Sequence, residues 1–389
     1  MTGEMPTPPL DSKRNGSKPH IMVFPYPAQG HLLPLLDLTH QLICLHGDIT
    51  VSIIVTPKNL PYLSPLLTAH PSAVSAVTFP FPQNPSLPLG VENVKDIGPS
   101  GNPLIMASIR QLREPIVSWL SSHLNTPVAI ISDFFLGWTN DLGIPRFAFF
   151  SSGAFLASIL HFFSDKLHLF ESTQPVCLSD LPLSPVFKTE HLPSLSQRSP
   201  STQDLECQRD TMMNFSSYGC VFNSCQCLEG EYLDYVKLKM GHNRVFGVGP
   251  LSSVGWICAI HLLWKSKVLT KDQCDALALA LEKSMTRFVW VVKTDPIPDG
   301  LEDRSGRDQF VDARLLVEHK GVAVIVCEGG DTVPDPNQLG RVLAETMGEC
   351  GRDVRGRAKA MGQVTQAATE AGGSSDADLE RLVIELSCL

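Results

Sequence analysis

The stretch HIMVFPYPAQGHLLPLLDL, residues 20–38, joins a short apolar run to an apolar helical pattern through a turn rich in Pro and Gly. The run from Ile21 to Phe24 predicts a buried strand, and the leucines between Leu32 and Leu45 recur at helical spacing. A buried strand that leads directly into a helix is the opening unit of an α/β domain with a parallel sheet. The stretch therefore predicts that fold class and leaves Gly30 and His31 at the junction.

The same alternation continues through the first half of the chain. Further strands are predicted at 48–57, 75–81, 126–135 and 144–150, and the last leads into a helix at 153–163. The Pro-rich segments 79–103 and 171–203 are read as long loops, which either line a site or are surface insertions.

The length of 389 residues favours two domains. We expect a disordered leader at 1–19, a Rossmann-like N-terminal domain at 20–247, a linker at 248–265 and a second α/β unit at 266–389. In the second unit, Thr270 and Gln273 have the spacing of a capping box ahead of a helix. It offers only two clear strands, at 287–293 and 321–329, whereas a Rossmann-like domain has about six.

Composition narrows the possible partners. The net charge of −9 and the lack of a Lys/Arg-rich block argue against nucleic acid. The eleven cysteines form no CxxC pair and no His-flanked metal spacing, which indicates reduced thiols in a cytoplasmic protein. The apolar segment 256–264 is too short to span a bilayer, so we expect no membrane span, and we expect a monomer.

His31 is the first candidate for chemistry. A single glycine before it does not make the G-x-G-x-x-G fingerprint, which excludes a nicotinamide-cofactor enzyme. A helix N-terminus favours the neutral imidazole, and a neutral imidazole at the carboxyl edge of a parallel sheet suits a general base for a hydroxyl group. The alternative for a lone histidine is a structural cap.

Asp133 is the second candidate. It ends the predicted strand at 126–135 in AIISDFF, and so lies at the same sheet edge as His31. A carboxylate there would orient the imidazole and stabilise its protonated form. An ordinary turn or capping Asp is the competing interpretation.

Taken in order, HIMVFPYPAQGHLLPLLDL, ISDFFLGW, FGVGPLS, LTKDQCDALALALEKSMTRFVWVVK and DQFVDARLLVE resemble the plant family-1 UDP-glycosyltransferases. The resemblance runs from His20 to the C-terminus and is greatest to the enzymes that glycosylate flavonols and simple phenolics. It implies a GT-B fold, in which two Rossmann-like domains face each other across a cleft, with the last helix returning to the first domain.

The resemblance also implies a reaction and its residues. His31 matches the catalytic base and Asp133 its partner, and a UDP-sugar donates its sugar with inversion to a phenolic or flavonoid acceptor. Ser151 matches a position that contacts the sugar or its phosphate. Asp308 and Gln309 match the end of the signature box that binds the sugar, where Gln goes with glucose. Neither a metal nor a cofactor beyond the UDP-sugar substrate is implied.

One departure from the family is large. Between 287–293 and DQFVDARLL, the family has a box with a Trp-Ala-Pro-Gln stretch that stacks on uracil and a His-Cys-Gly-Trp-Asn-Ser stretch that binds the diphosphate. In this chain DGLEDRSGR runs directly into DQFVDARLL, and WICAIHLLWKSKV matches the preceding strand poorly. A diphosphate leaving group needs preorganised donors, and losing even one such donor costs roughly 100 to 1,000-fold in rate.

Three interpretations stay open at this point. The chain is a working UDP-glycosyltransferase, or a catalytically impaired remnant that binds small aromatics without turnover, or the product of an incorrect gene model or altered splicing of an intact enzyme. Sequencing the transcript would separate the last from the others.

Overall fold

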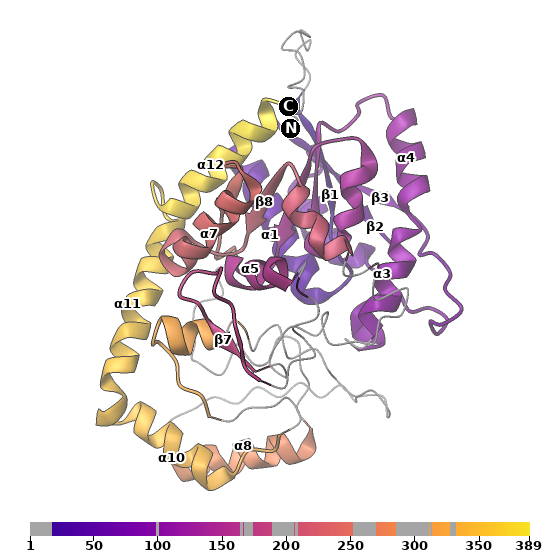
Figure 1. Cartoon of the computed structure of the whole chain (residues 1–389). Coiled ribbons are helices and arrows are strands. Elements are labelled where there is room, and N and C mark those ends of the chain that lie inside the picture. Colours follow the sequence, from indigo (N-terminus) through magenta and orange to yellow (C-terminus); the bar gives the residue numbers. More distant parts are fainter. Residues whose placement is uncertain are drawn as a thin grey trace.

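The computed structural model describes residues 18–98, 101–163, 166, 174–188, 206, 209–251, 270–284, 311, 313–326 and 332–389. Its centre is a seven-stranded sheet in the order β3-β2-β1-β4-β5-β8-β9, in which every neighbouring pair is parallel (Figure 1). The strands are β1 (His20–Phe24), β2 (Thr50–Val55), β3 (Val74–Thr78), β4 (Ala129–Asp133), β5 (Arg146–Phe150), β8 (Gly219–Phe222) and β9 (Val245–Gly247). The predicted α/β class with a parallel sheet is confirmed.

β1 lies in the middle of the sheet, and the strand order reverses beside it. Ile21 is in register with Val51 of β2 on one side and with Ala129 of β4 on the other. The chain builds outward from β1 to β3 and then crosses back to continue from β4. In an open parallel sheet, the crevice outside the carboxyl ends of two such strands is the usual place for a ligand site.

Helices cover both faces of the sheet, which explains why its strands are continuous apolar runs. Hydrophobic side chains of α1 (Gln29–Leu45) and α2 (Ser64–Ala69) pack on one face. Those of four helices pack on the other, namely α3 (Asn102–Arg110), α4 (Arg113–Ser122), α5 (Ala154–Phe163) and α7 (Gln226–Met240). Among the described residues, no helix is long and apolar enough to cross a membrane.

The last helix, α12 (Ser374–Ser387), packs beside α1 and along the edge strand β9 (Figure 1). Leu382 and Leu386 are fully buried in the same hydrophobic cluster as α1. The carboxylate of Asp378 accepts a hydrogen bond of 2.8 Å from the Gly247 N–H. An edge strand leaves backbone donors without a strand partner, and here a helix side chain takes one of them.

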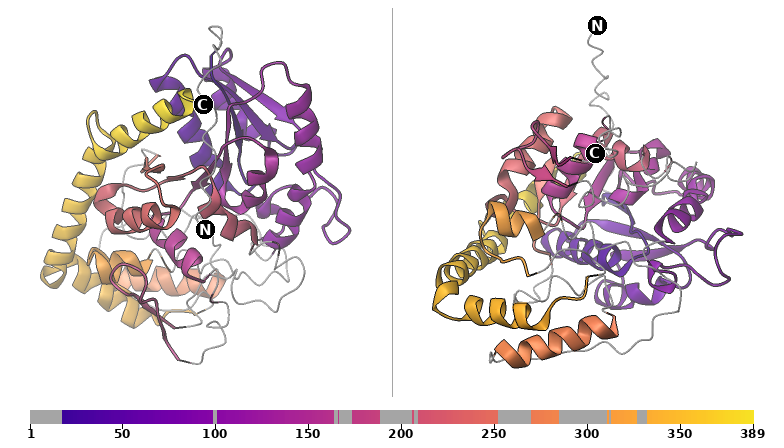
Figure 2. Two further views of the ribbon diagram at one scale, coloured as in Figure 1. Left: turned by 45° about the horizontal axis from the view of Figure 1, so that its top comes forward. Right: turned by 60° about the horizontal axis from the view of Figure 1, so that its bottom comes forward.

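The C-terminal part contains α8 (Lys271–Ser284), α10 (Pro336–Met347) and α11 (Arg352–Thr369), and α8 and α10 pack against each other (Figure 2). The capping box is confirmed, with Thr270 Oγ accepting from Gln273 N–H at 3.2 Å and Gln273 Oε1 accepting from Thr270 N–H at 3.1 Å. The strand expected at 321–329 is wrong for 321–326, which are irregular. A strand needs a neighbour for its backbone hydrogen bonds, and the described residues beyond β9 contain no other strand.

Segment 171–203 is described only at 174–188, where the loop predicted from its Pro and Ser content contains a short hairpin. Its strands are β6 (Val176–Cys177) and β7 (Val186–Phe187), and they pair in antiparallel register. The segments 252–269 and 285–310, which hold the rest of the expected linker and the strand at 287–293, lie outside the described residues.

We predict that His20 makes the stability of the fold depend on pH. Its ring is buried, with Nδ1 2.6 Å from the carbonyl oxygen of Asn125 and Nε2 2.8 Å from Ser52 Oγ. Burial lowers its pKa below the ordinary value of 6.5. Below that value the unfolded chain binds a proton that the folded chain resists, so stability falls as the pH drops from 6.5 to the folded pKa and then levels off.

Replacing His20 with Asn should remove this part of the slope and cost about 1 to 2 kcal/mol of unfolding free energy at neutral pH, since two buried hydrogen bonds are disturbed. Urea unfolding across this pH range measures both effects. The pKa values of His242 and His319 are also lowered by burial, so part of the slope should remain. An unchanged slope in His20→Asn, equal to that of the exposed-site control His46→Asn, would contradict the prediction.

Candidate active site

His31 and Asp133 meet at the point where the strand order reverses. His31 is the third residue of α1, which follows β1, and Asp133 is the last residue of β4. His31 Nδ1 lies 2.9 Å from Asp133 Oδ2. The carboxylate is fully buried, whereas the His31 side chain is 20% exposed. An ionised carboxylate can only accept, so Nδ1–H is the donor in this contact, and in the neutral form of such a ring the lone pair lies on Nε2.

The second oxygen of Asp133 fixes the carboxylate in place. Oδ1 accepts a hydrogen bond of 2.9 Å from the Phe135 N–H, at the start of the 3₁₀ segment Phe134–Leu142. The two interpretations of Asp133 drawn from the sequence are therefore compatible, because one oxygen caps the turn while the other holds the imidazole. A carboxylate bound at both oxygens has little freedom to rotate, which holds the ring of His31 in one orientation.

Arg146 of β5 forms hydrogen bonds with the last two residues of β4. Its guanidinium is fully buried and donates to four acceptors, namely Ser132 Oγ, the Asp133 carbonyl oxygen, Asn214 Oδ1 and Ser217 Oγ, at 2.7 to 3.0 Å. Burial lowers the pKa of Arg146 to about 10. The side chain therefore ties the backbone of Asp133 to the 3₁₀ segment Met213–Ser216 and the turn that follows it.

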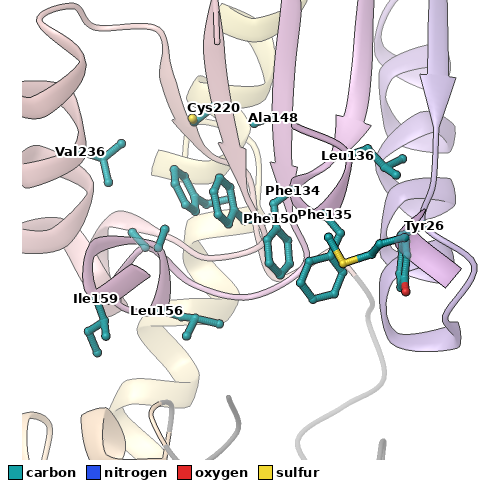
Figure 3. Close-up of a cluster of buried hydrophobic side chains, with 14 of the residues drawn as sticks. Tyr26, Phe134, Phe135, Leu136, Ala148, Phe150, Leu156, Ile159, Cys220 and Val236 are labelled. Atoms are coloured by element: carbon teal, nitrogen blue, oxygen red, sulfur yellow. The ribbon is translucent and has the colours of Figure 1, made fainter. Parts of the chain in front are cut away.

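Aromatic rings surround the imidazole of His31. Phe135 stacks on it with ring centroids 5.0 Å apart, and Tyr26 meets it edge-on at 5.6 Å. Figure 3 shows Phe134, Phe135 and Phe150 grouped at the ends of the strands, with Tyr26 beside them. The imidazole thus stands in a largely apolar setting, in which electrostatic interactions are stronger than in water.

Ser151, which follows β5, places Oγ 3.5 Å from His31 Nδ1. The first turn of α1, the last residue of β4 and the residue after β5 therefore bring together His31, Asp133 and Ser151 at the carboxyl edge of the sheet. Asp308 and Gln309 lie outside the described residues.

Arg146 and the ring pair Phe134–Phe135 were not assigned a role from the sequence. The paired phenylalanines directly after Asp133 are visible in ISDFF, and an arginine inside an apolar strand is visible in IPRFAFF. A charged residue in a buried strand is a usable signal, because such a side chain is tolerated only when it is fully hydrogen-bonded.

We predict that Arg146→Met destabilises the fold by about 3 kcal/mol or more, since it leaves several buried acceptors without a hydrogen-bond donor. Arg146→Lys should cost less, because an ammonium group keeps the charge but cannot span the same acceptors. Guanidinium chloride unfolding provides the measurement. Arg113→Met, at a half-exposed position on α4, is the matched control and should change stability by less than about 0.5 kcal/mol. Equal stability of Arg146→Met and this control would overturn the role given to Arg146.

Residues 18–253 match the family model described as Glycosyltransferase, N-terminal domain. The chain is 54% identical to UDP-glycosyltransferase 89A2 of Arabidopsis thaliana over 97% of this chain and 98% of the relative. It is 37% identical to the flavonol 3-O-glucosyltransferase UGT89B1 of the same plant, over 85% and 88%. The first alignment spans 456 positions, more than the 389 residues present, so this chain lacks residues that the relative has within the aligned region.

Among solved structures, the chain is similar to UGT89C1 of Arabidopsis thaliana complexed with quercetin, with a TM-score of 0.69 and 27% identity over 96% of this chain and all of the other. The same protein complexed with UDP-L-rhamnose gives a TM-score of 0.70. The fold is thus of the GT-B type in a shorter chain. With these matches, the chain belongs to the plant family-1 UDP-glycosyltransferases, which transfer a sugar from a UDP-sugar to a small acceptor.

Proposed function

We propose that this chain transfers glucose from UDP-glucose to a phenolic hydroxyl of a flavonoid or a similar small aromatic, with His31 as the general base. The observation that carries the proposal is the 2.9 Å hydrogen bond between His31 and Asp133 at the sheet edge where the strand order reverses. Two similar proteins support a flavonoid acceptor. One is a flavonol 3-O-glucosyltransferase, and the structure of the other is complexed with quercetin.

The proposed reaction moves one proton and one glycosyl group. A phenol has a pKa of about 10 and is protonated at neutral pH, so it needs a base to become a good nucleophile. His31 Nε2 takes the phenolic proton as the oxygen forms a bond to the anomeric carbon. The bond from that carbon to the UDP oxygen breaks, and UDP leaves with the electron pair. Attack from the face opposite UDP inverts the configuration.

Asp133 is a positioning residue in this scheme. Its buried carboxylate keeps the proton of the neutral ring on Nδ1 and stabilises the imidazolium that forms when Nε2 accepts the second proton. Ser151 is proposed to contact the sugar or its phosphate, and its hydroxyl lies beside the ring of His31. The rings of Tyr26 and Phe135 are buried against His31, so in this scheme they hold the imidazole in place rather than contact the acceptor.

The identity of the sugar has less support than the role of His31. Asp308 and Gln309 are proposed to bind the sugar hydroxyls, and the preference for glucose rests on Gln309. One similar protein is a glucosyltransferase, whereas a similar solved structure is complexed with UDP-L-rhamnose. Both donors therefore belong in the assay.

Residues 20–247 are proposed as the acceptor domain and residues 266–389 as a shortened donor domain, joined by the linker 248–265. We propose that the protein acts as a monomer in the cytoplasm.

A second candidate function is binding of a small aromatic without turnover. It is favoured by the residues missing within the alignment to UDP-glycosyltransferase 89A2 and by the gap in the signature box. His31 and Asp133 belong to the N-terminal sheet, so acceptor binding does not depend on the missing segment. Departure of UDP does, since a diphosphate leaving group needs preorganised hydrogen-bond donors.

Titration calorimetry and product analysis separate the two functions. Quercetin should bind in both cases, because the acceptor side of the site is formed by the N-terminal sheet. For a working enzyme, we expect UDP to bind and a glucoside to form from quercetin and UDP-glucose. Quercetin binding without UDP binding and without product would identify the binding-only function. A chain that binds neither ligand would contradict both.

The role of His31 is tested by substitution. We predict that His31→Ala lowers kcat by about 100 to 10,000-fold with little change in quercetin affinity, because only proton transfer is lost. Asp133→Asn should also lower kcat, since an amide no longer selects the Nδ1–H form of the ring. Product formation by mass spectrometry and calorimetry supply the two readouts. His46→Ala, at an exposed site, is the control. Normal turnover by His31→Ala would show that His31 is not the general base.

A further inference from the structure

Three potential metal ligands gather on the surface of the N-terminal half, away from the His31 site. His40 and Cys44 are four residues apart on α1 and so lie on one face of that helix, a histidine–cysteine spacing that was overlooked in the sequence. His70 is the residue that ends α2. One ligating atom of each side chain lies within 4.8 Å of those of the other two, with His40 and Cys44 exposed and His70 half-buried.

The distances suit one small ion. His40 Nδ1 lies 2.8 Å from His70 Nε2, and Cys44 Sγ lies 4.0 Å from His40 Nδ1. A tetrahedral zinc ion, with bonds of about 2.0 Å to nitrogen and about 2.3 Å to sulfur, holds its ligand atoms about 3.3 to 3.6 Å apart. The two nitrogens would separate by about half an ångström. Cys44 Sγ now lies closer to His40 Nε2, at 3.6 Å, and within 4.8 Å of the His70 nitrogen, so it would turn toward Nδ1 and move up to about 1.2 Å closer to His70. Side chains on an exposed surface can make such shifts through small rotations.

The imidazoles of His40 and His70 contact each other through one nitrogen of each ring. Two nitrogens at 2.8 Å must share one proton, with one ring donating and the other accepting. A metal ion can replace that shared proton, since each nitrogen then presents its lone pair to the ion. The thiol of Cys44 completes a donor set of two nitrogens and one sulfur.

We propose that His40, Cys44 and His70 form a zinc-binding site with three protein ligands and one position open to water. Two imidazoles and a thiolate are the ligand types that zinc prefers, whereas Mg²⁺ and Ca²⁺ prefer oxygen. His31 and His40 are nine residues apart on α1, or about 13 Å along the helix axis. The site is therefore separate from the proposed chemistry, and it joins the C-terminal half of α1 to the end of α2.

A bound ion should stabilise the fold because the unfolded chain does not hold the three side chains together. His70 precedes β3, the outermost strand of the sheet on that side, so the ion would fasten the α2–β3 connection to α1. Glycosyl transfer by His31 does not require this ion.

The test uses the full-length protein without a histidine tag, kept reduced and stripped of metal. Zinc is titrated by calorimetry, and Co²⁺ is added as a spectroscopic probe of sulfur ligation. We expect one equivalent of zinc to bind, a thiolate-to-cobalt absorption band to appear, and the melting temperature to rise with zinc. Cys44→Ser and His70→Ala should each weaken zinc binding by more than about tenfold and abolish the rise in melting temperature.

Cys350→Ser removes an exposed thiol outside the cluster and should leave zinc binding unchanged. Cys44 is exposed and His70 half-buried, so substitution of either should not prevent folding, and circular dichroism of each variant checks this. The absence of stoichiometric zinc binding to the unaltered chain would overturn the proposal. So would equal zinc affinity in Cys44→Ser and in the Cys350→Ser control. Binding of copper(I) with no binding of zinc would reject zinc as the ion.

Discussion

The candidate site depends on the buried guanidinium of Arg146. Burying a charge is costly unless hydrogen bonds replace the lost water, and Arg146 meets this condition by donating to four acceptors around the end of β4. One acceptor is the carbonyl oxygen of Asp133. Asp133 in turn holds Nδ1 of His31, so the orientation of the partly exposed imidazole follows from a chain of hydrogen bonds that begins inside the sheet.

The parallel sheet brings this chain of contacts to the surface at one place. Strands that run in the same direction end at the same edge, and the strand order reverses between β1 and β4 at that edge. His31 follows one of these strands and Asp133 ends the other. Aromatic rings around the imidazole limit its contact with water, which strengthens its interaction with the carboxylate. The proposed proton transfer thus rests wholly on the N-terminal sheet.

Unlike the N-terminal half, the C-terminal part forms helices and no strand among its described residues. Its helices α8 and α10 pack against each other, and α12 returns to cover the edge strand β9. The family's signature box is shortened in this chain, and the alignment to a close relative contains more positions than the chain has residues. In the proposed scheme, acceptor chemistry and donor binding belong to separate segments of the chain, so losing part of one would not by itself remove the other. Binding and turnover are therefore separable measurements for this protein.

Much of the fold follows from local pattern. Apolar runs and helical patterns predicted β1, β2, β3, β4 and β5 and the parallel α/β class, because buried strands and amphipathic helices have different periods. The strand β8 was not predicted, because its four residues are too few for a clear pattern. A strand was predicted at 321–329, but residues 321–326 are irregular. His31 and Asp133 were both selected from sequence, since one begins the helix that follows a predicted strand and the other ends a predicted strand. Their 2.9 Å contact, the four bonds of Arg146 and the meeting of His40, Cys44 and His70 were decided only by tertiary structure, because each joins residues that lie far apart along the chain and no local pattern records which distant segments will pack together.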